Sequence, residues 1–170
     1  MGDNILECTL PFGVAFNTEW CYLLGDFGVE VRGQSAKLIP LPETVCFGDL
    51  THQGFPFYGG NITYHLPVET KTDKLSVTIP HYVGTMITLN SDKAIIYPPY
   101  TAHIDVTPGK SVLDITLFGN RQNSFGHVHC ADRKLAWIGP GAWRTKNHEW
   151  SYEYILRELG IMSTPNILEI

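Results

Sequence analysis

Apolar and polar residues alternate along much of the chain, and the alternation is most regular within Tyr97–His129. It runs through Ala102–Val106 and again through Val112–Phe118, with a Pro-Gly turn at Pro108–Gly109 between the two segments. A period of two is typical of half-buried antiparallel strands, because successive side chains of a strand point to opposite faces. The pattern therefore predicts two consecutive strands that pair as a hairpin and start a sheet.

In the second of these strands, Leu113, Ile115 and Leu117 share one face, whereas Val112 lies on the other. Further short alternating segments occur on both sides, and Gly, Pro, Asn and Asp residues separate them. Asn90–Lys93 reads as a hairpin-type turn. Leu6–Phe16 is predicted to form one strand or two broken at a turn, because it contains Pro11 and Gly13. The additional predicted strands are Val29–Val31, Asn61–Glu69, Lys74–Pro80, Thr85–Asn90, Ser151–Leu159 and an edge strand within Gly160–Ile170.

The spacing of these strands indicates the fold class. Short strands that recur about every eight to twelve residues, with turns between them, are typical of an all-β antiparallel sandwich. Two prolines make Leu38–Leu50 an edge or connecting segment, and the Gly- and aromatic-rich Phe47–Asn61 is predicted to be an ordered surface loop. Ser151–Leu159 also has helical character. No internal repeat or low-complexity stretch divides residues 1–170, so we expect a single domain.

Charge argues against two classes of partner. The formal net charge is -5, and the lysine and arginine residues are scattered rather than clustered. Nucleic-acid binding by neutralisation of phosphates requires a basic face, and so does attraction to an anionic membrane surface. We therefore expect neither nucleic acid nor membrane as a partner.

The sequence also suggests a compartment. No apolar run is long enough for a transmembrane helix, and the first residues lack the basic and apolar regions of a signal peptide. The four cysteines are widely spaced without a C-x-x-C pair, which favours buried free thiols over disulfides or a zinc site. These cysteines are Cys8, Cys21, Cys46 and Cys130. Together these features predict a cytoplasmic protein.

A series of short motifs occurs in order within residues 57–126. The motif residues are Gly60, Tyr64, Met86–Asn90, Pro98–Tyr100, Asp105–Thr107, Gly109, Leu113–Leu117 and Asn120 or Asn123. Their order resembles the sugar-binding domain of glycoside hydrolases, such as family 2 enzymes, which has the galactose-binding-like jelly-roll fold. The later segment WIGPGAWRT with EWSYEYILRELGI is similar to the closing part of accessory domains in large bacterial rhamnosidase-related glycosidases. The chain departs from the first pattern at Ser91, where glycine is usual, and at Lys110–Ser111, where an asparagine is usual.

The resemblance implies a function for the chain. It predicts a non-catalytic carbohydrate-binding or accessory domain, with a catalytic glycosidase domain supplied by sequence outside this chain. A carbohydrate and that catalytic domain would be its partners. No cofactor is implied, and the resemblance leaves open whether a loop binds a structural calcium ion. A purely structural spacer without a ligand is the remaining alternative on the same fold.

Candidate sugar-binding residues lie in two loops. A pyranose is recognised by an aromatic face against its C–H groups and by planar polar side chains that bond its hydroxyls. The residues that match this chemistry are Tyr58 and Asn61 in the first loop, and Trp137, Trp143, Arg144 and Asn147 in the second. The alternative for the aromatic residues is a structural role, in which they close the ends of the sandwich.

Catalytic chemistry has weaker support. His127 and His129 would share one face of a strand, as in the H-x-H of cupin metalloenzymes, and His148 could be a third ligand. The glutamate that cupins place shortly after this motif is missing, so a hydrogen-bonded strand pair is the alternative. Glycoside hydrolysis requires two opposed carboxylates, and the spacing of the acidic residues singles out no such pair. We therefore assign no catalytic residue and no metal ligand.

Overall fold

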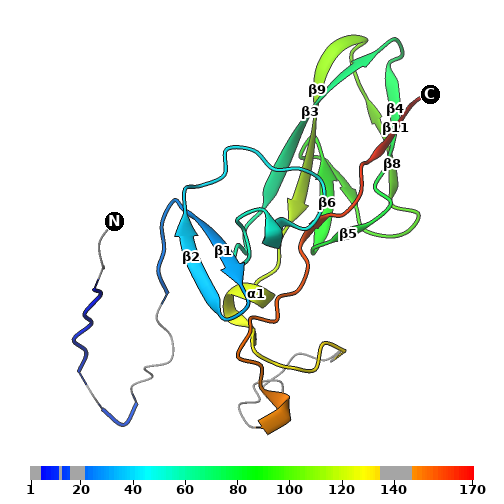
Figure 1. The fold of residues 1–170 in the computed structure, drawn as a ribbon. Coiled ribbons are helices and arrows are strands. Elements are labelled where there is room, and N and C mark those ends of the chain that lie inside the picture. Colours follow the sequence, from blue (N-terminus) through cyan, green and yellow to red (C-terminus); the bar gives the residue numbers. More distant parts are fainter. Residues whose placement is uncertain (1–4, 12, 16–21, 135–146) are drawn as a thin grey trace.

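The computed structural model describes residues 5–11, 13–15, 22–134 and 147–170 (Figure 1). Two antiparallel sheets form a sandwich, which confirms the all-β fold class expected from the strand spacing. The four-stranded sheet has the order β3 (Ile62–Thr70), β9 (Gly109–Phe118), β6 (Met86–Leu89) and β7 (Lys93–Ile95). The three-stranded sheet has the order β11 (Asn166–Glu169), β4 (Lys74–Thr78) and β8 (Thr101–Asp105).

Smaller elements flank the sandwich. The strand pairs are β5 (Tyr82–Val83) with β10 (Gly160–Ile161), and β1 (Gly28–Arg32) with β2 (Ser35–Ile39). The helical turns among the described residues are η1 (Leu50–His52), α1 (Gln122–Phe125) and η3 (Asn147–Glu149). No helix in this part of the chain has the length and apolar character needed to span a membrane. The β1–β2 hairpin lies beside the sandwich, close to α1 (Figure 1).

The core lies between the two larger sheets. Leu113, Ile115 and Leu117 on β9 are almost completely buried, whereas Val112 on the same strand is 57% exposed. The faces predicted from the alternation are therefore confirmed. The opposing sheet contributes buried Leu75, Val77 and Ile104 to the same cluster. Burial of these side chains is the main stabilising term for the sandwich, since each fully buried aliphatic residue contributes about 1.5–3 kcal/mol.

The predicted pairing of the strands on either side of Pro108–Gly109 is wrong. β8 pairs with β4, whereas β9 pairs with β3 and β6. The Val106 N–H donates to the Asp73 carbonyl at 2.9 Å, at the end of the three-stranded sheet, and Gly109 then pairs with Thr70 in the other sheet. The Pro-Gly turn thus carries the chain from one layer to the other. Alternation identifies a strand and its buried face, but it does not identify the neighbouring strand.

Ser151–Leu159 was predicted to be a strand and is irregular. Its backbone N–H groups donate to several separate segments rather than to one neighbouring strand. Tyr154 donates to Gly33, Ile155 donates to Val128, and the Leu159 N–H donates to the Asp49 carboxylate. The segment therefore ties the β1–β2 hairpin, the region after α1 and the η1 turn together.

Other departures concern exposure and the N-terminal region. The described residues of Leu6–Phe16 form no strand, because Pro11 and Gly13 interrupt it and no described segment pairs with it. Phe47–Asn61 is an ordered loop, but it also contributes fully buried Leu50 to the core. The three described cysteines are free thiols, as predicted, but their predicted burial is wrong for Cys8 and Cys46. Cys130 is buried, whereas Cys8 and Cys46 are exposed because they lie in irregular segments outside the core, and Cys21 lies outside the described residues.

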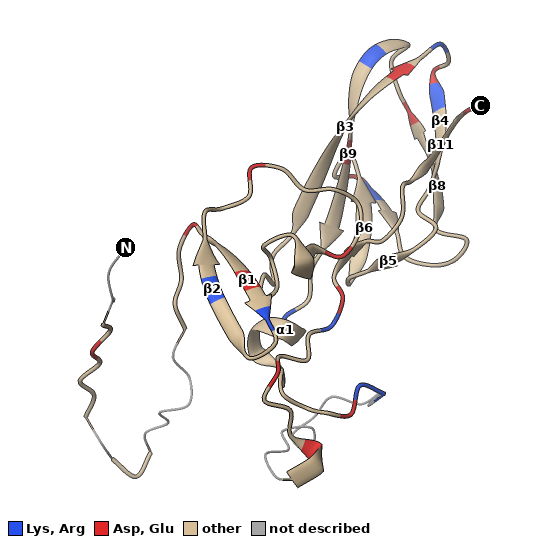
Figure 2. Cartoon of the chain, viewed as in Figure 1, with Lys and Arg blue, Asp and Glu red and all other residues tan. Residues whose placement is uncertain are grey.

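Charged residues of both signs are distributed over the described elements (Figure 2). Residues of opposite charge face each other at two places in the sheets, at Glu69 and Lys110 across β3 and β9 and at Lys74 and Asp105 across β4 and β8. This distribution agrees with the scattered lysine and arginine residues in the sequence. In the view of Figure 2, the described elements therefore offer no cluster of basic residues that would attract a polyanion.

Candidate functional site

Tyr58 and Asn61 are brought together by the loop that follows η1. The Tyr58 hydroxyl donates a hydrogen bond to the Asn61 backbone carbonyl at 3.1 Å, and the Tyr58 side chain remains 42% exposed. Its ring meets the Phe55 ring edge-on, with the centroids 5.8 Å apart. The ring also lies over Gly60, since a Cβ atom at that position would come within 2.6 Å of the Tyr58 Cζ atom. The loop therefore holds an exposed aromatic ring in a defined place.

Contacts with the short helix α1 and with the irregular segment Ser151–Leu159 hold this loop. The Ser124 hydroxyl donates to the Phe57 carbonyl at 2.6 Å, and the Phe57 ring packs against Tyr154 with a centroid distance of 5.6 Å. A Cβ atom on Gly59 would meet the Ser124 hydroxyl at 3.0 Å. Close packing of this kind limits the conformations open to the loop and so reduces the entropy lost when a ligand binds.

The second predicted loop can be placed only in part. Trp137, Trp143 and Arg144 lie outside the described residues. Asn147 begins η3, is exposed and has a positive φ of 55°. Within the described part of the chain, no hydrogen bond or ring contact links Asn147 to Tyr58 or Asn61. Of the six residues proposed from the sequence, the structure therefore brings two together.

The expectation that His127 and His129 share one face of a strand is wrong. Both residues lie in irregular chain after α1. His129 stacks on Trp150 with ring centroids 4.5 Å apart, and its Nδ1 lies 3.0 Å from the Ser151 carbonyl oxygen. No group of three His, Cys, Asp or Glu side chains among the described residues is arranged to hold a metal ion. The geometry that suggested a cupin-like site is therefore missing from the described residues.

Burial lowers the pKa of His127, and the nearby positive charge of Arg157 lowers it further. The folded protein therefore favours the neutral imidazole, while the unfolded chain takes up a proton below about pH 6.5. We expect the stabilising effect of neutral His127 to be complete above that pH and to be lost as the pH falls toward the lowered folded-state pKa.

Urea denaturation at about pH 7.5, 6 and 5 measures this effect. His127→Gln is expected to make stability less dependent on pH than it is in the natural protein. His103→Gln removes an exposed imidazole on β8 and is the matched control. Equal pH dependence in the natural protein and His127→Gln would contradict the assignment.

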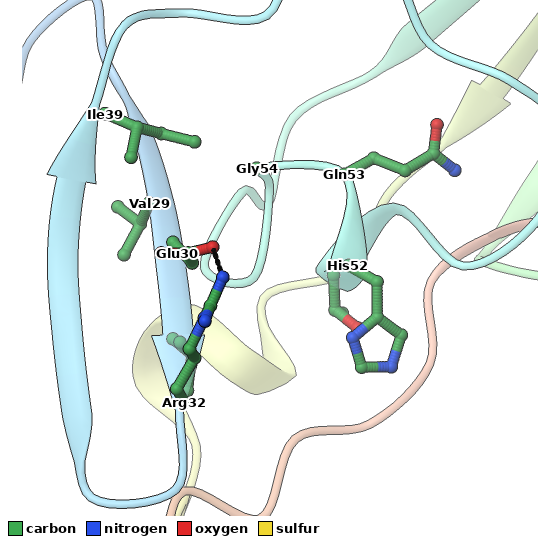
Figure 3. A pocket seen from close by; sticks show the side chains of 9 residues that line it. Val29, Glu30, Arg32, Ile39, His52, Gln53 and Gly54 are labelled. Carbon is green, nitrogen blue, oxygen red and sulfur yellow. Dashed lines mark hydrogen bonds and ion pairs between the residues drawn. The ribbon is translucent and has the colours of Figure 1, made fainter.

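A cleft that the sequence did not reveal lies between β1 and the turn that follows η1 (Figure 3). We call it the hairpin cleft, and its volume is about 300 Å³. Its lining residues are Val29, Glu30, Val31, Arg32, Ile39, Thr51, His52, Gln53 and Gly54. Three segments form it, from β1, β2 and the η1 region, and no local pattern in the sequence shows that the hairpin meets η1.

The polar side chains of the hairpin cleft differ in whether their hydrogen-bonding groups are already used within the protein. The Arg32 guanidinium and the Glu30 carboxylate pair at 2.7 Å along β1, and Figure 3 shows both between the strand and His52. The Gln53 amide is already occupied, because it bonds the Cys46 backbone in both directions, at 2.8 and 3.1 Å. Glu30, Arg32 and His52 therefore carry the polar side-chain chemistry of the cleft.

Asp49 has a structural role beside the cleft. Its carboxylate accepts hydrogen bonds from the backbone N–H and hydroxyl of Thr51 and from the Leu159 N–H, at distances of 2.8–3.2 Å. These bonds hold the η1 turn against the irregular segment before β10.

In comparisons with known proteins, no family model, curated protein or solved structure matches the chain. A proposal for the function therefore rests on the order of the sequence motifs and on the geometry of the molecule itself.

Proposed function

We propose that this chain is a non-catalytic carbohydrate-binding or accessory domain of a glycoside hydrolase. Its role would be to bind a glycan or to support a catalytic domain encoded outside this sequence. The observation that carries the proposal is the fixed pairing of the exposed Tyr58 ring with Asn61 on an antiparallel sandwich. Loops of a rigid sheet scaffold are common places for binding residues, because the scaffold fixes their positions.

The chemistry of this pair suits a sugar. One face of a pyranose ring carries C–H groups that pack against an aromatic ring, while its hydroxyls need donors and acceptors in one plane. The Asn61 side-chain amide offers one donor group and one acceptor, and the residue is exposed. Because the Tyr58 hydroxyl bonds the Asn61 backbone carbonyl, the ring and the backbone that carries the amide are positioned relative to each other before a ligand arrives.

Titration calorimetry with a panel of monosaccharides and oligosaccharides tests the proposal. A binding domain is expected to release or absorb heat with at least one member of the panel. An accessory domain without a sugar site is expected to bind a glycosidase catalytic domain instead. Absence of heat with every sugar, together with no association with a catalytic domain, would rule out both roles and leave the structural spacer.

Gly60→Ala is expected to weaken sugar binding about tenfold while changing the melting temperature little. The added methyl group would displace the Tyr58 ring rather than backbone atoms. Calorimetry measures the affinity, and thermal unfolding measures the stability. Gly13→Ala is the matched control, because a Cβ atom at Gly13 would have nothing within 4 Å. Unchanged affinity in Gly60→Ala would exclude the Tyr58 ring from the site.

A further inference from the structure

The β1 strand has one backbone edge that faces away from β2. Only two residues separate Arg32 from Ser35, which form the closing pair of the β1–β2 hairpin. In a hairpin with a two-residue turn, the closing pair exchanges backbone hydrogen bonds, and every second pair along the ribbon does the same. The N–H and C=O groups of the intervening residues, Val29 and Val31, therefore point away from β2.

Part of this outer edge has no hydrogen-bond partner among the described residues. The Val29 N–H donates to the Gly54 carbonyl at 2.9 Å, and the Gly33 carbonyl accepts from the Tyr154 N–H at 3.0 Å. Between these two bonds, no described residue bonds the outward-facing C=O of Val29 or the outward-facing N–H and C=O of Val31. Both residues line the hairpin cleft, and their outward-facing groups lie on the edge of β1 that meets Gly54 on the opposite wall.

Side chains add complementary groups above and below this edge. Glu30 and Arg32 lie on one face of the ribbon, and Val29 and Val31 lie on the other, because residues alternate along a strand. The ion pair of Glu30 and Arg32 leaves both side chains accessible, with 41% and 80% of their surfaces exposed. Backbone and side chains therefore present donors and acceptors close together, next to an apolar surface that includes Ile39.

We propose that the hairpin cleft binds one sugar unit of a glycan, through the free backbone edge at Val31 and the paired side chains of Glu30 and Arg32. Adjacent hydroxyls of a neutral sugar each donate and accept, so they can bond a carboxylate, a guanidinium and the peptide groups at once. A volume of about 300 Å³ lies at the small end of the range for ligand pockets, which suits a single ring. The ligand class rests on the proposed function, whereas the position of the site rests on the cleft alone.

Two other classes of ligand fit less well. An extended peptide that joins a sheet needs a continuous edge, whereas Gly54 and Tyr154 occupy the edge of the hairpin at both ends of the cleft. A simple anion would be attracted by Arg32, but Glu30 offsets that charge at 2.7 Å. A compact neutral molecule with many hydroxyl groups matches the site best.

Nuclear magnetic resonance titration of the ¹⁵N-labelled full chain with the panel of monosaccharides tests this proposal. The Val31 amide resonance is expected to move with at least one sugar, and Glu30→Gln and Arg32→Met are each expected to weaken that binding about tenfold. Glu69→Gln and Lys110→Met are the matched controls, because these residues form a facing pair of opposite charges on β3 and β9 and do not line the cleft. A dispersed spectrum verifies that each variant is folded.

The outcomes separate this inference from the proposed function. Sugar binding that leaves the Val31 amide unmoved and is unaffected by Glu30→Gln and Arg32→Met would overturn the cleft site but keep the carbohydrate role. Absence of binding with every monosaccharide in the resonance titration would overturn the cleft site. If oligosaccharides also give no heat in calorimetry, the carbohydrate role is overturned as well. Movement of the Val31 amide by a short extended peptide, and by no sugar, would show that the cleft recognises backbone instead.

Discussion

Ile115→Ala is expected to lower the free energy of unfolding by about 2–5 kcal/mol. Ile115 lies on β9, the strand that pairs with both β3 and β6, and its side chain is completely buried. Its cross-strand neighbours, Tyr64 and Leu89, are buried too. Truncation to alanine would remove buried methyl and methylene groups and leave a cavity that neighbours on two paired strands cannot easily fill.

Urea denaturation measures this loss of stability as a lower midpoint. Val112→Ala is the matched control, because Val112 lies on the same strand with its side chain on the exposed face. Its effect is expected to stay within about 0.5 kcal/mol, as for most surface substitutions. Similar losses in the two variants would mean that β9 does not direct Ile115 into the core.

Gly160→Ala is expected to destabilise the protein by roughly 3 kcal/mol or more. Gly160 has a positive φ of 149°, a conformation that residues with a Cβ atom rarely adopt. An added methyl group would also collide with the backbone carbonyl oxygen of Gly48. The neighbouring hydrogen bonds, from Gly48 N–H to Ile161 and from Leu50 N–H to Leu159, are each 2.7 Å long, so the two segments cannot separate without losing them.

Gly109→Ala isolates the contribution of backbone strain. Gly109 has a positive φ of 113°, but a Cβ atom there would have nothing within 4 Å. Its substitution is expected to cost only the strain, about 1–3 kcal/mol, and thus less than Gly160→Ala. Thermal and urea unfolding of both variants provide the comparison. Equal losses would contradict the close approach of Gly48 and Gly160, which positions the η1 turn and one wall of the hairpin cleft.

Residue patterns alone were sufficient for the strands and their buried faces. The alternation around Ile115 and the turn residues between segments predicted the strands of both large sheets except β7, because a period of two directly reflects side-chain direction in a strand. Residue type alone also selected Tyr58 and Asn61. The motif order that resembles a sugar-binding domain stays a prediction, since no known protein matches the chain.

Contacts between distant segments decided the rest. The partners of β8 and β9 depend on how two sheets stack, and alternation carries no information about that choice. Ser151–Leu159 alternates like a strand, yet its N–H groups bond several separate segments, so no ladder forms. The hairpin cleft exists because Val29 bonds Gly54 and Gly33 bonds Tyr154, across about 25 and 120 residues of sequence. Every residue except proline has a backbone N–H and a C=O that can form hydrogen bonds, so the sequence does not show which of them will stay unpaired. Only the folded chain decides that the outer edge of β1 at Val31 keeps such groups.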